Sequence, residues 1–286
     1  MPERFFCSDL SRSEQEPLGA TASRIDHWLL VEYRGLWGPD ALRASGLSDQ
    51  VKRSLREQVR ARRNTRLLFV RRPDRRGRPK LRAYAATSRA GEESLRSHAL
   101  ESYEDLRALD LASGGDALDN PLFIVCTHGK HDPCCARYGR PVFEALTEQL
   151  DEEWVWQSTH VGGDRFAGNV VCLPHGVFYG RLDREDAIEL LDEHFAGRVV
   201  LDKYRGRSIF TFGEQAAERG IREREQILEL DGLELVETDG VHVTFRDVLG
   251  HTHRLTIVAE QREPRRLTCA SAEERRPWRF RVSESV

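Results

Sequence analysis

The sequence predicts an α/β fold in which short strands are flanked by helices. Apolar runs such as HWLLVEY (27–33) are typical of strands, whereas the amphipathic stretch 136–150 is typical of a helix. This alternation occurs in residues 1–115 and again, more clearly, in residues 116–213. With 286 residues the chain is long enough for two domains of ordinary size, each with its own core.

The first unit, residues 1–115, is expected to have the order β-α-β-β-α. Ser48 is a suitable N-cap for its first helix, and the Gly-bearing loop 72–79 favours a hairpin between its second and third strands. A Ser-Gly-Gly stretch at 113–115 closes the unit. The predicted elements are a strand over 27–33, a helix over 48–62, strands over 66–71 and 81–86, and a helix near 92–110.

The second unit, residues 116–213, repeats this order. Its last two strands are expected to form a hairpin around Pro174-His175-Gly176. The predicted elements are a strand over 121–125, a helix over 136–150, strands over 154–158, 170–173 and 177–181, and a helix over 184–195.

Elements of this size and order indicate a thioredoxin-like fold, with two such units in tandem. Beyond residue 213 the composition changes, and a helix near 214–228 is followed by alternating strands over 233–237, 241–246 and 252–259. Residues 214–286 are therefore expected to form a small α+β appendage rich in strands, or a winged-helix-like one. The helix mixes Glu and Arg evenly, which disfavours DNA recognition.

Charge and hydropathy exclude several classes of function. The net charge of −3 gives no electrostatic footprint for nucleic acid, and the Arg-rich run 71–79 is interpreted as a solvated loop. No apolar run approaches the length of a membrane span, and the N-terminal residues lack the pattern of a signal peptide. We expect a cytoplasmic protein whose six cysteines stay reduced and serve metal or redox chemistry.

Three of these cysteines lie in one polar stretch, CTHGKHDPCC (126–135). Cys126 ends a predicted strand, and Cys135 immediately precedes a predicted helix, whose N-terminal amides favour negative charge. Thiolates bind soft or borderline metals. Cys134 and Cys135 are adjacent, so we expect one of them to bind the metal and the other to face away.

A second stretch, THVGGDRFAGN (159–169), supplies harder donors. Gly162 and Gly163 allow a close backbone approach or a positive φ, so that His160 and Asp164 on either side of them can face one centre.

Other residues are less informative. Cys172 is expected in the core, Cys7 and Cys269 can pair or pack together, and Arg165 and His131 are candidates for hydrogen bonds to the ligands.

The chain resembles the sucrase/ferredoxin-like family, bacterial relatives of yeast thioredoxin-like ferredoxins. The matching residues are CTHG (126–129), Asp132, Cys135, Gly139, HVGGDRFAGN (160–169), PHGVFYGR (174–181), WGPDAL (37–42) and the N-terminal CSDLSR and EPLGATA. The resemblance implies a [2Fe–2S] cluster held by two Cys and two His of an HxGGH motif. Carried over by position, the ligands are Cys126, Cys135 and His160, and the second His is replaced here by Asp164.

We therefore predict a [2Fe–2S] protein that acts in one-electron transfer or redox sensing with a redox partner protein, and that is a carrier more than an enzyme. Cys134 is the nearest other candidate for the fourth ligand, and His128, His131, Cys172 and Cys269 are more remote ones. Two alternatives remain: a structural zinc module with Cys, Cys, His and Asp ligands, and a thiol oxidoreductase that uses Cys126 or the Cys134–Cys135 pair. The sequence lacks the CxxC at a helix start that thiol oxidoreductases commonly use.

Overall fold

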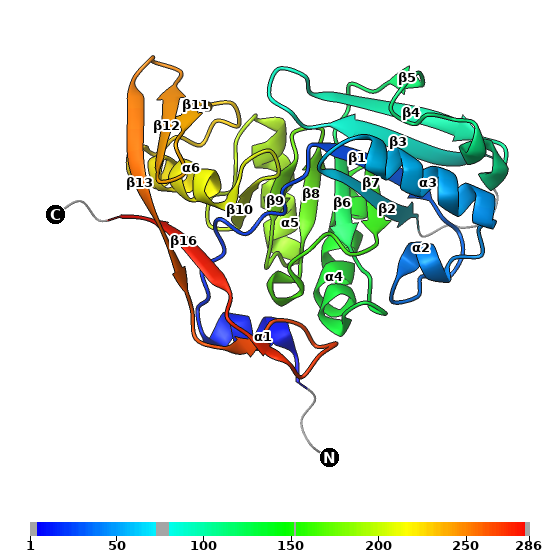
Figure 1. The fold of residues 1–286 in the computed structure, drawn as a ribbon, viewed down its shortest axis with the longest axis horizontal. Coiled ribbons are helices and arrows are strands. Elements are labelled where there is room, and N and C mark those ends of the chain that lie inside the picture. The colour runs from blue at the N-terminus through cyan, green and yellow to red at the C-terminus, as the bar shows by residue number, and fades with distance from the viewer. Residues whose placement is uncertain (1–4, 73–79, 152, 284–286) are drawn as a thin grey trace.

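The computed structural model describes residues 5–72, 80–151 and 153–283. Within these residues one large sheet is packed against helices, and a smaller sheet with helix α6 lies beside it (Figure 1). The helices are α1 (Cys7–Ser13), α2 (Ala41–Ala44), α3 (Asp49–Ala61), α4 (Pro133–Gln149), α5 (Arg184–Phe195) and α6 (Phe212–Glu225), with short 3-10 helices η1 (Tyr103–Arg107) and η2 (Asp164–Phe166).

The large sheet has ten strands among the described residues, in the order β10-β9-β8-β6-β7-β2-β1-β3-β4-β5. The strands are β1 (His27–Glu32), β2 (Thr65–Arg71), β3 (Leu81–Thr87), β4 (Ser94–Leu100), β5 (Asp116–Ala117), β6 (Leu122–Cys126), β7 (Val155–Ser158), β8 (Val170–Leu173), β9 (Val177–Tyr179) and β10 (Tyr204–Arg207). Each half contains two parallel strands that are connected through a helix, and one of these strands pairs with an antiparallel hairpin. In the first half β1 is parallel to β2 and pairs with the β3–β4 hairpin. In the second half β6 is parallel to β7 and pairs with the β8–β9 hairpin. The two halves meet where β2 pairs with β7.

The first half departs from the sequence-based prediction in two places. The hairpin predicted between 66–71 and 81–86 is wrong, because β1 lies between β2 and β3 and pairs with both. The predicted loop 72–79 lies, apart from Arg72, outside the described residues. The helix predicted near 92–110 is also wrong, because residues 94–100 pair along their whole length with β3 and only 103–107 form a 3-10 helix. Pairing with an existing strand edge satisfies this backbone and overrides its local propensity.

The second half follows its prediction closely. Helix α4 begins at Pro133, and the carboxylate of its N-cap, Asp132, accepts a hydrogen bond from the backbone of Cys134. Helix α5 occupies the predicted residues 184–195, and β8 and β9 form the predicted hairpin. Ser48 caps α3 as expected.

Alternate residues of the strands build cores on both faces of the sheet. Phe123 and Val125 of β6 pack with α4 and α5, whereas Leu122 and Ile124 pack with Trp28 and other residues of the first half. On the first half, α3 covers a third cluster that includes Leu29 and Val31. One of these cores therefore draws on strands from both halves.

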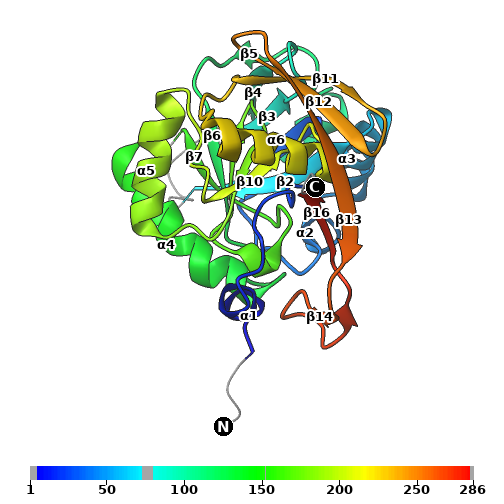
Figure 2. The ribbon, with the colours of Figure 1, turned by 90° about the vertical axis from the view of Figure 1, so that its left-hand side faces the viewer.

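The C-terminal region forms the strand-rich α+β unit that the sequence predicts. Its strands β11 (Leu233–Thr238), β12 (His242–Asp247), β13 (Thr252–Gln261) and β16 (Trp278–Val282) form an antiparallel sheet, and β14 (Arg265–Arg266) pairs with β15 (Glu274–Arg275). Helix α6 packs on the four-stranded sheet (Figure 2). The division into 1–115, 116–213 and 214–286 stays a prediction. In the described part of the chain, none of the helices has both the length and the apolarity needed to cross a bilayer.

Candidate metal centre

The predicted ligands lie at or just after the carboxyl ends of two neighbouring parallel strands. Cys126 ends β6 and Cys135 lies in the first turn of α4. His160 follows β7, and Asp164 begins η2. Strands β6 and β7 run parallel with Cys126 opposite Ser158, so the segments that leave their carboxyl ends meet at one edge of the sheet. This edge is where open α/β sheets commonly bind ligands. Helix α4 then approaches closely, since a side chain on Gly139 would collide with the carbonyl oxygen of Cys126.

The two thiols and the imidazole converge there. The Sγ atoms of Cys126 and Cys135 lie 4.0 and 3.8 Å from Nδ1 of His160, and the three donor atoms all lie within 4.8 Å of one another. Both cysteines are buried, whereas the His160 side chain is 19% exposed. The three residues can therefore bind one metal centre close to the surface.

Two residues are placed to supply a fourth donor. Oδ1 of Asp164 lies 3.0 Å from Nδ1 of His160 and 3.5 Å from Sγ of Cys135. His131 stacks on the His160 ring at 4.0 Å between centroids, and its Nε2 lies 4.0 Å from the Asp164 carboxylate. His131, His160 and Asp164 thus form a second donor group that shares His160 with the first.

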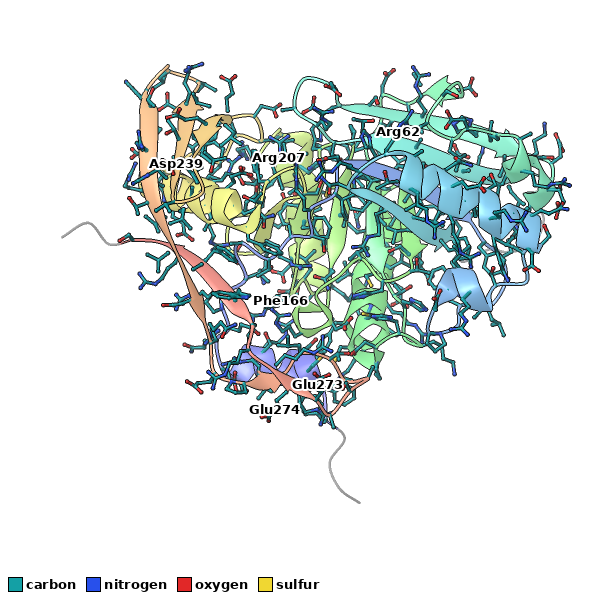
Figure 3. All side chains as sticks on the ribbon, in the orientation of Figure 1. Arg62, Phe166, Arg207, Asp239, Glu273 and Glu274 are labelled. Atoms are coloured by element: carbon teal, nitrogen blue, oxygen red, sulfur yellow. The ribbon has the colours of Figure 1, made fainter. Side chains whose placement is uncertain are left out.

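The glycine pair and a buried arginine shape the histidine loop. Gly162 and Gly163 both have positive φ, at 107° and 83°, and a side chain on Gly163 would collide with the guanidinium of Arg205. Arg205 is 1% exposed and donates to the carbonyl of Gly162 and to Oδ1 of Asn169. Its guanidinium lies 5.2 Å from the ring of buried Phe166, which is labelled in Figure 3. Arg205 therefore fixes the loop that carries His160 and Asp164.

Hydrogen bonding and burial set the protonation of the donors. The pKa of Cys126 is held well below its ordinary value, chiefly by the hydrogen bond with Cys135 and then by His160. The same pairing, together with burial, raises the pKa of Cys135 well above its ordinary value. Burial opposes a charged His160, but the hydrogen bond and charge of Cys126 outweigh it and raise the pKa of His160. Burial also raises the pKa of Asp164. Cys126 is thus favoured as a thiolate, the form that binds metals.

The structure separates Cys134 from this group. Its Sγ lies 3.7 Å from Sγ of Cys7 and 3.5 Å from Sγ of Cys269. Cys7 and Cys269 therefore pack together, with Cys134 between them. Cys172 lies in the core beneath α4 and α5.

Two other candidates have partners away from the donor group: His128, a remote candidate for the fourth ligand, and Arg165, a candidate for hydrogen bonds to the ligands. His128 donates from Nε2 to the carbonyl of Gly38 and accepts at Nδ1 from the backbone of His160, so both of its ring nitrogens have partners. Arg165 forms an ion pair with Glu16 at 2.9 Å. His128 therefore supports the His160 loop, and Arg165 is directed to the N-terminal segment.

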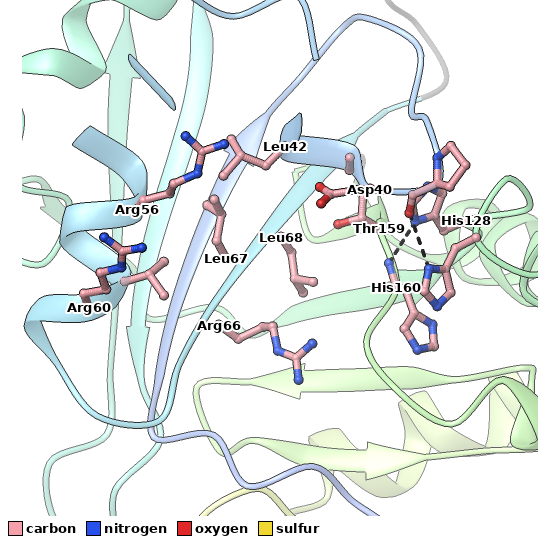
Figure 4. Close-up of a pocket in the computed structure, with 14 residues that line it drawn as sticks. Asp40, Leu42, Arg56, Arg60, Arg66, Leu67, Leu68, His128, Thr159 and His160 are labelled. Carbon is pink, nitrogen blue, oxygen red and sulfur yellow. Dashed lines mark hydrogen bonds between the residues drawn. The ribbon is translucent and has the colours of Figure 1, made fainter. Parts of the chain in front are cut away.

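A surface cavity of about 380 Å³ opens beside the two stacked histidines (Figure 4). His128, His131 and His160 form one part of its wall, and Arg56, Arg60 and Arg66 form another.

Sequence reasoning missed Arg66 and Arg205, because neither lies in a recognisable motif and only the packing of β2 and β10 brings them to the centre.

Comparisons with known proteins identify one matching family and several similar proteins. Residues 18–206 match the family described as sucrase/ferredoxin-like. Proteins named "Altered inheritance of mitochondria protein 32" are similar over part of the chain. The protein from Meyerozyma guilliermondii is 36% identical over 99 residues, 31% of this chain and 35% of the relative, and that from Debaryomyces hansenii is 27% identical over 95 residues, 30% of this chain and 35% of the relative. The matched region thus spans about a third of the length of these relatives. No solved structure matches the chain significantly.

Proposed function

The chain belongs to the sucrase/ferredoxin-like family, and from this premise we propose that it carries a [2Fe–2S] cluster and acts in one-electron transfer or redox sensing. The proposed ligands are Cys126, Cys135, His160 and Asp164. The observation that carries the proposal is the convergence of two thiols with one nitrogen and one oxygen donor at the carboxyl ends of β6 and β7.

The donor set fits such a cluster. A [2Fe–2S] cluster takes two protein ligands on each iron, and in Rieske centres one iron has two Cys and the other has two His. Cys126 and Cys135 form a hydrogen-bonded thiol pair, and His160 and Asp164 form a separate pair 3.0 Å apart. When bound, the cluster would supply one-electron chemistry, and Arg205 and His128 would hold the His160 loop in place.

The strand order supports a thioredoxin-like fold for each half. Four strands of residues 116–213 have the order β9-β8-β6-β7, with β6 and β7 parallel and joined by α4, and with α5 after the hairpin. Of the other two strands in this range, β10 pairs with β9 at the edge and β5 pairs with β4 of the first half. Residues 1–115 order theirs β4-β3-β1-β2, with β1 and β2 parallel and joined through α3. The same order in both halves favours two tandem thioredoxin-like units, of which only the second has the closing helix in the described residues.

We also propose that donor and acceptor proteins approach the cavity beside His131 and His160. His160 is the most exposed of the four proposed ligands, and electrons would leave the centre most directly there. The arginines of the cavity wall favour an acidic partner surface.

A structural zinc site is the second candidate. It is favoured by the short spacing of the donors, since the Sγ atoms of Cys126 and Cys135 and Nδ1 of His160 lie within 4.8 Å of one another, as they would around a single ion. A zinc protein would be colourless and inert to one-electron reduction.

Anaerobic purification followed by iron, sulfide and zinc analysis distinguishes the two candidates. We expect about two irons and two sulfides per chain, with visible absorption and an EPR signal after reduction. Cys126→Ser and Cys135→Ser should each abolish the cluster. Cys134→Ser is the matched control and should retain it, because Cys134 has the same chemistry but faces Cys7 and Cys269. Zinc without sulfide at this centre, or loss of the cluster in Cys134→Ser with retention in Cys135→Ser, would overturn the assignment.

A further inference from the structure

A second group of thiols lies beside the metal centre and takes no part in it. Cys7 belongs to α1, Cys134 to the first turn of α4, and Cys269 to the segment between β14 and β15. In Figures 1 and 2, α1 and this C-terminal segment lie together below α4. Three stretches that are far apart in the sequence thus bring one sulfur each to a single place.

The spacing of the donors is that of a tetrahedral metal site. The Cys7–Cys134 and Cys134–Cys269 Sγ distances are 3.7 and 3.5 Å, and Sγ of Cys7 lies 3.8 and 3.9 Å from the two oxygens of Asp132. All four donor atoms lie within 4.8 Å of one another. Four ligands about 2.3 Å from a zinc ion would place their sulfurs about 3.8 Å apart.

Asp132 is held in place and keeps room for a ligand bond. Its Oδ1 accepts from the backbone of Cys134 at 2.9 Å, and its Oδ2 accepts from the hydroxyl of Thr268 and the backbone of Cys269 at 2.8 and 2.6 Å. A carboxylate offers about four acceptor positions, so one remains. The backbone of Cys7 donates to Sγ of Cys269 at 3.2 Å. Such outer hydrogen bonds orient the ligands of metal sites.

We propose that Cys7, Cys134, Cys269 and Asp132 form a structural zinc site that fastens α1 and the C-terminal segment to α4. Three thiolates and one carboxylate suit a borderline-soft ion, and four protein ligands suit a closed structural site. Three of the four are buried, and Cys269 is half-buried. Direct side-chain links between the two termini include Arg265 with Glu14, and Arg266 over the ring of Phe5 at 3.8 Å. The proposal does not depend on which metal the first centre holds.

The test uses the full chain carrying Cys126→Ser and Cys135→Ser, which disables the first centre. Purified without added metal, this protein should hold about one zinc per chain. Adding Cys7→Ser or Cys269→Ser should lower the zinc content at least tenfold, and adding Cys172→Ser, a buried thiol outside the group, should leave it unchanged. Asp132→Asn keeps the cap of α4 and should weaken zinc binding.

A second measurement covers variants that fold poorly. Cobalt(II) replacing zinc should give thiolate-to-metal charge-transfer absorption, which should weaken with each thiol removed and stay unchanged in Cys172→Ser. Removal of the ion with a chelator should speed hydrogen exchange in α1 and around Cys269, with little effect in β1–β3.

Three results would overturn the proposal. One is a metal-free chain in which Cys7, Cys134 and Cys269 are all free thiols. Another is a mass two hydrogens lower, which would show a disulfide within the group. The third is equal zinc in the Cys269→Ser and Cys172→Ser variants. Loss of iron at the first centre changes none of these readouts, so the two proposals fail separately.

Discussion

Cys134 and Cys135 show how much a single residue position decides in this protein. Both thiols are buried and adjacent in the first turn of α4. Cys134 contacts Cys7 and Cys269, whereas Cys135 contacts Cys126 and His160. Successive side chains on a helix are about 100° apart, because 3.6 residues complete a turn. The helix therefore directs two neighbouring thiols into two different donor groups.

Asp164 is the proposed ligand whose role is most open to a direct test at this scale. We expect Asp164→Ala to release the cluster roughly tenfold faster or more, a loss at least as large as that for outer-shell partners. Asp164→His should keep a cluster with altered absorption and potential, since imidazole replaces carboxylate. Cluster lifetime in air, followed by visible absorption, measures both.

The control for the two Asp164 variants is Asp26→Ala. Asp26 is 9% exposed and Asp164 is 8% exposed, but the Asp26 carboxylate is hydrogen-bonded to Asn64 instead. If Asp164→Ala and the parent have the same lifetime while His131→Ala loses the cluster, His131 is the fourth ligand instead.

At the scale of the elements, helix placement decides which side chains lose contact with water. Helix α5 buries His194 of its last turn against β6, where the His194 ring lies 5.3 Å from the Phe123 ring and 5.6 Å from the His175 ring. Burial lowers the pKa of His194 to about 4 and also lowers that of His175. The folded protein therefore holds His194 neutral at a pH where an unfolded chain would protonate it.

This burial predicts a loss of stability in mild acid. The folded-state pKa lies below the unfolded value of about 6.5, so the stability present above pH 6.5 falls as the pH drops toward 4. At pH 4.5 the loss from His194 should be roughly 2 kcal/mol. Urea unfolding of the parent and His194→Gln at pH 7 and 4.5 measures it, and the variant should lose less stability. His242→Gln serves as the control, because His242 is half-exposed and pairs with Asp239 at the surface. An identical pH dependence in all three proteins would contradict the prediction.

At the scale of the whole molecule, the two halves of the large sheet share one core. Leu30 and Trp28 from the first half pack in the same cluster as Ile124 and Trp156 from the second, and β2 pairs with β7 across the boundary. Cooperative unfolding of the two halves follows from this arrangement, because exposing one half removes the packing of the other.

Leu30→Ala should therefore destabilise both halves. Leu30 is fully buried, and such truncations cost about 2–5 kcal/mol. Native-state hydrogen exchange should become faster in β6 and β8 as much as in β1. Leu255→Ala, in the separate core of the C-terminal sheet, should mainly affect β11–β13. Faster exchange in β1 with unchanged exchange in β6 and β8 would show that the halves unfold independently.

The sequence by itself determined the elements of the second half and selected the four proposed ligands. Helix 184–195 and the 170–181 hairpin are local structures, and Cys126, Cys135, His160 and Asp164 lie in two short motifs beside them. Only the tertiary structure decided the place of β1 between β2 and β3 and the strand at 94–100, because strand pairing depends on partners that are distant in the sequence. The same holds for Arg205 beside the His160 loop and for the gathering of Cys7, Cys134 and Cys269. These residues are far apart in the sequence and belong to no common motif or repeating pattern. Only the packing of the folded chain brings them together.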